Sequence, residues 1–370
     1  MTNSTTTPVF HKTMPAAQAR AEIGGWQQVA GRLQVPALIG HAQRSPREHV
    51  VTYEDVFVSG RCQYLLGDLI AIADQDPSTT HRVTAMINAV CDDLITAAAT
   101  TGRTTTLDQC TPALYQDRIR PGGRVDTWYL QHDPAIAAPH PDALLPLSTL
   151  TGYRLTANGT PLHLDVPKAI RTARRALHPG STWTSAITQG DPTEPNIATS
   201  AAGACWLDLE HAGRNTLPGE IANLLWYLLA MGGWLVPVYQ PDVYARTLPL
   251  HYPPPATPRI EHVDLSPRHR RLDIHYTWPL GPGRHAALTQ LLARLAHDLG
   301  PAAGLDPARP LTTLAPFLTL RILGVIPPSR LTATDLLLLL AKLAEAQAPQ
   351  HPAFTRTDPL PALTAPLERP

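Results

Sequence analysis

Charged side chains are scarce in this sequence: Asp, Glu, Lys and Arg make up 16% of the 370 residues, against about 25% in a typical globular protein. The 30 basic and 30 acidic residues cancel, so the formal net charge is zero. A neutral chain with few charges lacks the basic surface that binds nucleic acid or an anionic membrane. We therefore expect no nucleic-acid partner and no membrane partner.

Several short signals are also missing. The four cysteines are Cys62, Cys91, Cys110 and Cys205. They share no short spacing, which argues against a zinc site and is typical of free thiols in a reducing compartment. Residues 1–8 lack the basic and apolar segments of a secretory signal. The longest apolar stretch, 224–238, is shorter than the roughly 20 residues of a membrane helix. We expect a cytoplasmic protein with neither a P-loop nor a nucleophile-elbow motif.

Hydrophobic periodicity predicts a mixture of strands and helices. Strands are expected at 9–12 and 50–58, with hairpins at 153–166, around Asn158-Gly159, and at 260–278. Helices are expected at 18–33, 79–101, 168–177, 220–231, 284–299, 310–323 and 334–347, with Gly300 as a cap of the 284–299 helix. The 220–231 helix is apolar nearly all round, which indicates burial in a core. The last 22 residues hold six prolines and are expected to form a flexible tail.

One segment carries the chemistry. Residues 187–197 read Ile-Thr-Gln-Gly-Asp-Pro-Thr-Glu-Pro-Asn-Ile, and 205–213 read Cys-Trp-Leu-Asp-Leu-Glu-His-Ala-Gly. Phosphoryl transfer needs a carboxylate near the attacking hydroxyl and hard oxygen ligands for Mg²⁺. A loop with Asp191 and Asn196, followed by a strand that delivers Asp208, can gather these groups at one point. Each residue alone would more often be a turn or strand-end residue, so the joint pattern carries the inference.

This segment resembles the catalytic loop and metal-binding strand of the aminoglycoside phosphotransferase–choline kinase family, relatives of the protein kinases. The family pattern is His-Gly-Asp-x-x-x-x-Asn, then a strand ending in Asp-x-Glu or similar. The resemblance implies that Asp191 is the catalytic base and that Asn196 and Asp208 are metal ligands. Glu210 would have a supporting role. Gln189 stands where the family has His, an orienting residue that Gln can replace as a hydrogen-bonding group.

The N-terminal segment resembles a reduced small lobe of the same family. The resemblance implies that Lys12 holds the nucleotide phosphates and that Glu22 pairs with Lys12. Taken alone, both residues read as solvated surface charges. Residues 50–56 resemble the hinge strand, where backbone groups around Glu54 and Val56 would meet adenine. Only eleven residues precede Lys12, and they contain no glycine-rich loop. A partner protein or another segment would then cover the phosphates.

The resulting expectation is an α+β, protein-kinase-like two-lobed fold. Its parts would be a reduced N-terminal lobe (1–57), a mostly helical C-terminal lobe (58–347) with a hairpin insertion (240–283), and a tail (348–370). The family resemblance implies ATP and Mg²⁺ as cofactors. It also implies transfer of the γ-phosphoryl group to a hydroxyl of a small molecule or of Ser/Thr in a natural-product precursor peptide. The alternative is a pseudokinase that binds a nucleotide, peptide or partner. The hairpin would shape acceptor choice. The alternatives are that it is a solvent-facing addition or that it forms a dimer contact.

Overall fold

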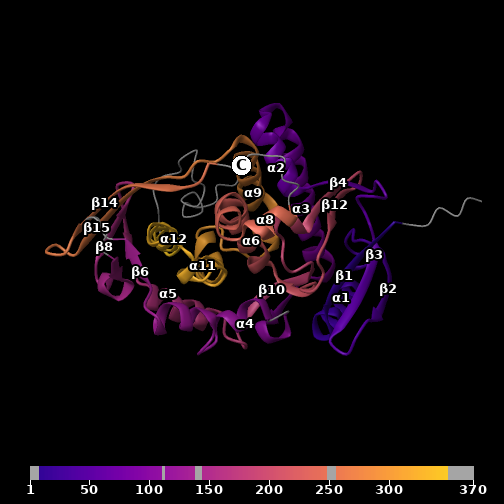
Figure 1. Ribbon diagram of the computed structural model, residues 1–370, viewed down its shortest axis with the longest axis horizontal. Helices are drawn as coiled ribbons and strands as arrows, with labels where there is room; N and C mark the ends of the chain where they lie inside the picture. The colour runs from indigo at the N-terminus through magenta and orange to yellow at the C-terminus, as the bar shows by residue number, and fades with distance from the viewer. Residues whose placement is uncertain (1–7, 111–112, 138–143, 248–255, 349–370) are drawn as a thin grey trace, which may run out of the picture.

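The computed structural model describes residues 8–110, 113–137, 144–247 and 256–348, which form a small and a large lobe (Figure 1). The small lobe is drawn in indigo at the right of the view. The large lobe is mostly helical, and its strands β14, β15 and β8 lie at the end opposite the small lobe. Helices make up 51% of the described residues and strands 24%, so the predicted α+β class is confirmed.

The small lobe contains four elements: β1 (Val9–Pro15), α1 (Ala16–Val29), β2 (Leu38–Gln43) and β3 (Glu48–Glu54). The strands form an antiparallel sheet in the order β1-β3-β2, in which Lys12 is opposite Val51. Helix α1 packs on this sheet through Ala19, which forms a small core with Met14 of β1 and with Val51 and Tyr53 of β3. Among the described residues β1 pairs only with β3, so its other edge is open.

The large lobe contains the remaining elements, which begin directly after the small lobe. Its strands are β4 (Cys62–Leu65), β5 (Arg103–Thr106), β6 (Ala135–Ala137), β7 (Leu144–Pro146), β8 (Arg154–Ala157), β9 (Thr160–His163), β10 (Thr182–Thr188), β11 (Ile197–Ser200), β12 (Gly203–Trp206), β13 (Gly213–Thr216), β14 (Arg259–Ser266) and β15 (Arg271–Thr277). Its helices are α2 (Leu66–Gln75), α3 (Thr80–Thr101), α4 (Ala113–Ile119), α5 (Val166–Ala176), α6 (Leu217–Trp226), α7 (Val236–Tyr239), α8 (Pro241–Thr247), α9 (Pro282–Arg294), α10 (Gly300–Ala302), α11 (Pro310–Leu323) and α12 (Ala333–Ala346).

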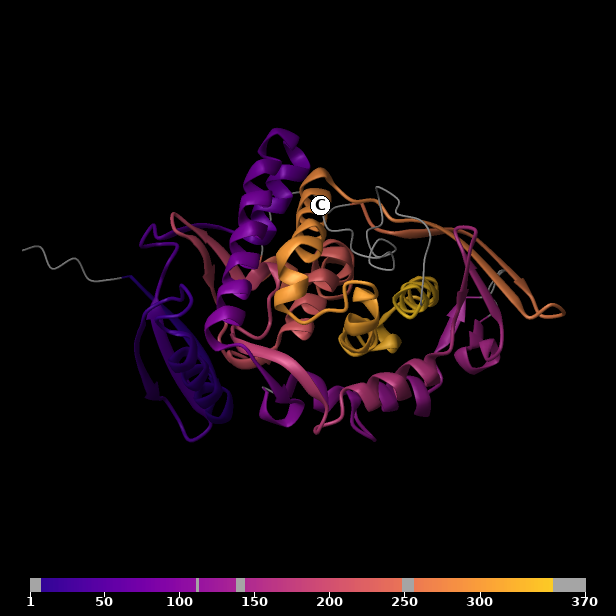
Figure 2. The same cartoon turned by 180° about the vertical axis from the view of Figure 1, so that it is seen from behind.

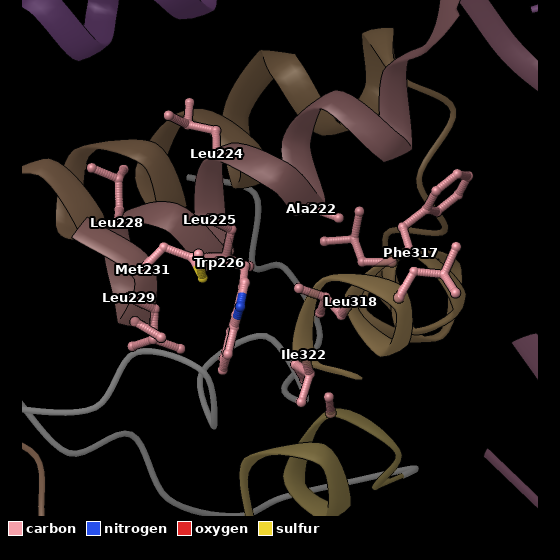
Figure 3. Close-up of a cluster of buried hydrophobic side chains, with 14 of the residues drawn as sticks. Ala222, Leu224, Leu225, Trp226, Leu228, Leu229, Met231, Phe317, Leu318 and Ile322 are labelled. Atoms are coloured by element: carbon pink, nitrogen blue, oxygen red, sulfur yellow. The ribbon is translucent and has the colours of Figure 1, made fainter. Parts of the chain in front are cut away.

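The centre of the large lobe is the continuous helix Leu217–Tyr239, which includes α6 and α7. It is apolar on all sides because other elements surround it. Figure 3 shows Leu225 and Trp226 in the same buried cluster as Leu318 and Ile322 of α11. This packing fixes the start of α6 next to the loop that carries Asp191.

Two helices among the described residues are long and apolar enough to cross a membrane, judged by length and composition alone: Pro77–Thr101 and Leu217–Tyr239. The second helix is longer than the apolar run 224–238, because it begins earlier, at Leu217, and ends at Tyr239. The chain also stays helical through Gly232 and Gly233. Within its most apolar window, 83% is buried inside the protein. The first helix packs along α9 and β10.

Both predicted hairpins are present. Asn158 and Gly159 connect β8 to β9 with φ angles of 48° and 80°, the positive values that a tight two-residue turn requires. Strands β14 and β15 form the second hairpin, and β15 also pairs in parallel with β8. The four strands make one sheet in the order β14-β15-β8-β9 at the far end of the large lobe (Figure 2).

The expected cap at Gly300 is wrong. Gly300 has helical dihedral angles, φ −59° and ψ −52°, and helical residues continue to Ala302. The first residue beyond with positive φ is Gly304, at 69°, where the side-chain-free residue permits the left-handed turn. The proline-rich tail lies outside the described residues except for Ala348.

Candidate active site

The loop after β10 carries Asp191 and runs against the segment that follows β12. Gly190 in this loop has a φ of 94°, and a Cβ added there would collide with the carbonyl oxygen of His211. Glycine is therefore required both for the backbone conformation and for the close approach. The contact brings the Asp191 loop beside the segment that carries Asp208.

Three side chains from three elements hold Asp191. Asn223 of α6 donates a hydrogen bond from Nδ2 to Asp191 Oδ1 at 2.7 Å. Arg321 of α11 donates from Nη2 to the same oxygen at 3.3 Å. Asn196 donates from Nδ2 to the Asp191 carbonyl oxygen at 2.9 Å and to Oδ2 at 3.4 Å. The Asp191 side chain is 25% exposed, so a ligand can still reach the carboxylate.

Gln189 connects the Asp191 loop to the Asp208 segment. Its Nε2 donates to the carbonyl oxygens of Leu207, at 2.8 Å, and Asp208, at 2.7 Å. Its Oε1 accepts from the Asp191 backbone N–H at 2.8 Å. Gln189 is buried, so these bonds are shielded from water. The amide thus performs an orienting role at the position where the resembled family has His.

Lys12 joins the two lobes through a pair of carboxylates. Its Nζ lies 2.9 Å from Glu22 Oε2 and also forms an ion pair with Asp208. Burial alone would lower the pKa of Lys12, but the carboxylates of Asp208 and Glu22 outweigh it and raise the pKa. Lys12 is therefore a fixed positive charge beside Asp208.

Glu22 is the buried anchor of this network. It is 1% exposed on α1 and accepts hydrogen bonds at Oε1 from the Tyr53 hydroxyl, at 3.2 Å, and the Leu209 N–H, at 3.3 Å. A buried carboxylate needs such partners, because an unpaired charge away from water is costly. Glu22 fixes Lys12 and connects α1 to the segment after Asp208.

Asn196 and Asp208 fit a magnesium ion by their chemistry. Asn196 uses Nδ2 for Asp191, which leaves the amide oxygen for a cation. The Asp208 carboxylate is 43% exposed at the side chain, and its backbone φ is 56°. The Leu207 N–H donates to the Asn196 carbonyl at 2.8 Å, so the two segments are adjacent. Oxygen donors of this kind suit Mg²⁺, which completes its coordination with phosphate oxygens. The described residues contain no cluster of three or more His, Cys, Asp or Glu that could hold a metal.

Glu210 contacts a neighbouring histidine and a residue of the small lobe. His211, 3.3 Å away, and the Gln18 amide both contact its carboxylate, and these hydrogen bonds lower the pKa of Glu210 to about 2. Gln18 is on α1, so Glu210 provides a second contact between the lobes. A supporting role of Glu210 in phosphoryl transfer stays a prediction.

The predicted hinge lies where the chain passes from the small to the large lobe. The Glu54 N–H donates to the Ala37 carbonyl at 2.9 Å, and its carboxylate binds Arg61 at 2.9 Å. The Val56 carbonyl accepts from the Cys62 N–H at 2.7 Å, and its side chain is buried beside Cys205. The predicted adenine contact would use the backbone groups near Glu54 and Val56 that do not make these bonds. This contact remains a prediction.

Several residues near Asp191 were missed by the sequence analysis. Asn223 and Glu220 lie three positions apart on α6, and Arg321 is a buried charge on the apolar helix α11. Polar residues within an otherwise apolar helix were the available signal. Glu220 accepts from the Gly190 N–H at 3.3 Å. Burial, with Asp191 as a neighbouring charge, raises the pKa of Glu220 to about 8.

The order of these groups along the chain is the one found in protein kinases. Lys12 on a strand and Glu22 on a helix come first, the predicted hinge follows, and the loop of Asp191 and Asn196 precedes Asp208. This order is the one that the predicted protein-kinase-like fold would have. No family model and no curated protein sequence matches it.

Solved structures that are similar to this chain include three kinases. One is an aminoglycoside phosphotransferase from Streptomyces rimosus in complex with ADP and streptomycin, 13% identical, with a TM-score of 0.33, covering 65% of this chain and 79% of that one. A glucosamine kinase is 11% identical, with a TM-score of 0.37 and coverages of 90% and 70%. An amicoumacin kinase in complex with AMP-PNP, Ca²⁺ and amicoumacin is 10% identical, with a TM-score of 0.41 and coverages of 92% and 81%. The predicted resemblance agrees with these matches.

The small lobe differs from the general protein-kinase pattern at β1. Among the described residues the sheet has three strands, and the strand that carries Lys12 is at an edge. A glycine-rich loop over the phosphates would precede this strand in a protein kinase. Val9 and Phe10 on β1 are exposed.

Proposed function

We propose that this protein is an ATP-dependent phosphotransferase whose acceptor is a hydroxyl group of a small molecule or of Ser/Thr in a precursor peptide. One observation carries the proposal. Lys12, fixed by Glu22, reaches Asp208, and Gln189 ties the Asp208 backbone to the loop of Asp191. A phosphate-binding cation, a metal-binding carboxylate and a partly exposed carboxylate therefore meet at the junction of the lobes.

Each group has a definite role in this proposal. Lys12 binds the α- and β-phosphates of ATP as a point charge, and Glu22 holds its position. Asn196 and Asp208 hold Mg²⁺. When bound, Mg²⁺ neutralises charge on the phosphate oxygens during transfer. The ion pair between Lys12 and Asp208 opens so that each group can engage the nucleotide.

Every bond and proton in the proposed reaction can be accounted for with ATP, the acceptor hydroxyl and Asp191. The acceptor oxygen forms a bond to the γ-phosphorus, the bond from that phosphorus to the β–γ bridging oxygen breaks, and ADP leaves. Asp191 accepts the proton of the hydroxyl. Asn223 and Arg321 both bind Oδ1 of Asp191, whereas Oδ2 accepts the longer hydrogen bond from Asn196, at 3.4 Å. Oδ2 is therefore the oxygen that faces the acceptor in this proposal.

Calorimetric titration with Mg²⁺–ATP, beside an ADP-formation assay with pooled hydroxyl acceptors, tests the proposal. Asp208→Ala should abolish metal-dependent nucleotide binding. Asp191→Asn should bind Mg²⁺–ATP normally and lose transfer, because the base touches only the acceptor. Equal loss of nucleotide binding in both variants would contradict these roles.

The second candidate function is a pseudokinase that binds a nucleotide, peptide or partner protein. The open edge of β1 favours it, since a partner strand there would cover the phosphates. Under either function we propose a cytoplasmic protein without nucleic-acid or membrane partners. Mg²⁺–ATP binding without ADP formation in any acceptor pool would favour the pseudokinase.

A further inference from the structure

Beside Asp191 the charges do not balance. Arg321 is 5% exposed and donates from Nη2 to Asp191 Oδ1, while its Nε is buried with no hydrogen-bond partner among the described residues. Arg118 of α4 is close enough to interact electrostatically with Arg321 and Asp191, and its Nη1 is also buried without a partner in the described part of the chain. A guanidinium has five donors in a fixed fork, and a buried donor left unpaired is costly. The arrangement therefore leaves donors available for a further anion.

The neighbouring groups do not supply that anion. Arg118 packs its stem at the end of α11, where a Cβ added to Gly324 would lie 3.2 Å from Arg118 Cδ. Arg124 is satisfied separately, because it donates to the Gly324 carbonyl at 3.1 Å and lies over the Trp128 ring. Glu220 is mostly neutral at pH 7, since burial raises its pKa to about 8. The single negative charge of Asp191 is then left to balance the two positive charges of Arg118 and Arg321.

The electrostatics of Arg118 agree with an unfilled site. Burial, followed by repulsion from Arg321, lowers the pKa of Arg118 to about 9, and the attraction of Asp191 only partly opposes this. Arg118 as a whole is only partly buried, and the neighbouring Asp191 side chain is 25% exposed, so this group of charges lies near the surface. An incoming carboxylate or phosphate would relieve the repulsion and satisfy the free donors.

We propose that Arg118, with Arg321, binds an anionic group of the acceptor, so that the substrate carries a carboxylate or phosphate close to the hydroxyl that Asp191 deprotonates. The inference rests on the proposed phosphotransferase function and specifies its substrate class. Arg118 binds this group and Arg321 also orients Asp191. An acceptor without an anionic group would leave both guanidiniums partly unpaired when water is excluded.

The test uses matched probes and saturation-transfer NMR titrations on the full chain with Mg²⁺–AMP-PNP present. D-gluconate and glucose 6-phosphate are the anionic probes, and D-sorbitol and glucose are their neutral counterparts. At least one anionic probe should bind tenfold or more tightly than its counterpart. Arg118→Gln should remove that difference, and Arg118→Lys should restore part of it. The control Arg120→Gln changes an exposed arginine two positions away and should stay within about twofold.

Equal binding of anionic and neutral probes to the unchanged protein overturns the inference, as does unchanged anion binding in Arg118→Gln. Preference for gluconate or for glucose 6-phosphate identifies a carboxylate or a phosphate as the recognised group. A parallel Mg²⁺–ATP titration separates this result from the proposed function. Loss of anion binding in Arg118→Gln with normal Mg²⁺–ATP affinity supports the acceptor role, whereas absence of Mg²⁺–ATP binding in the unchanged protein refutes the phosphotransferase itself.

Discussion

Asn223 holds Asp191 from the buried central helix, with Nδ2 2.7 Å from Oδ1. Asn223 is 2% exposed, and it connects the rigid core to the loop that carries the proposed base. The hydrogen bond occupies Oδ1, so Oδ2, which accepts only at 3.4 Å from Asn196 among the described residues, is the less occupied carboxylate oxygen. The precision of the site therefore depends on the packing of α6 and not on the loop alone.

Asn223→Leu should lower kcat by about tenfold to a hundredfold, because it removes one charge-assisted hydrogen bond of roughly 1.5–3 kcal/mol while keeping the side-chain volume. The affinity for Mg²⁺–ATP should not change. ADP formation and calorimetric titration measure the two effects. A fall in nucleotide affinity equal to the fall in kcat would show that Asn223 acts on the whole fold instead of on Asp191.

Lys12→Met should weaken Mg²⁺–ATP binding by about tenfold or more, since a charge-assisted contact to the phosphates is lost. The variant also leaves Glu22 buried without its cation, so the thermal midpoint should fall. Lys168→Met is the matched control, because Lys168 is exposed on α5. If both variants bind Mg²⁺–ATP like the unchanged protein, Lys12 is not the phosphate ligand.

Glu220 should make stability depend on pH. Its pKa rises from an ordinary 4.5 to about 8 in the folded state, chiefly through burial. The folded state then binds more protons than the unfolded state between these values, so Glu220 reduces stability progressively as pH increases from about 4.5 to 8. The loss is on the order of a few kcal/mol.

Urea unfolding of the unchanged protein and Glu220→Gln at pH 5.5 and pH 8.5 measures this effect. The neutral amide cannot ionise, so the variant should lose less stability between the two pH values. Glu48→Gln, at an exposed position on β3, serves as the control and should behave like the unchanged protein. Identical pH dependence in all three proteins would show that Glu220 titrates normally.

Trp278, just after β15, should contribute strongly to the free energy of unfolding. It is 4% exposed, its ring lies edge-to-face against Trp234 at 5.4 Å, and its Nε1 donates to the Leu229 carbonyl at 3.3 Å. Trp278→Ala should cost about 3–5 kcal/mol of unfolding free energy. Leu144→Ala, at an exposed position, should cost little by comparison. A loss below 1 kcal/mol at Trp278 would show that the hairpin packs loosely.

The hypothesis that the 260–278 hairpin shapes acceptor choice stays a prediction. Deleting the hairpin would also remove Trp278 from the core, so surface substitutions are the better test. Glu261 and His262 are exposed on β14. The double variant Glu261→Ala/His262→Ala should fold normally, and a changed KM for the acceptor would support the acceptor role.

The sequence by itself determined the local parts of this protein. Asp191, Asn196 and Asp208 lie within one loop and hairpin, and Lys12 and Glu22 lie within one strand and helix. Their geometry follows from short-range turns, glycine conformations and helical spacing. The hairpin at Asn158-Gly159 was predictable for the same reason, because positive φ at both turn residues selects these residue types.

Only the tertiary structure decided what surrounds Asp191. Arg118 and Arg321 are separated by about two hundred positions in the sequence, and α4 packs against the end of α11. The pairing of β15 with β8 is likewise a contact between distant segments. Such contacts depend on which apolar faces bury one another, and periodicity shows that a face is apolar without showing its partner. The core therefore determined the electrostatic balance at the site, and with it the class of acceptor that we propose.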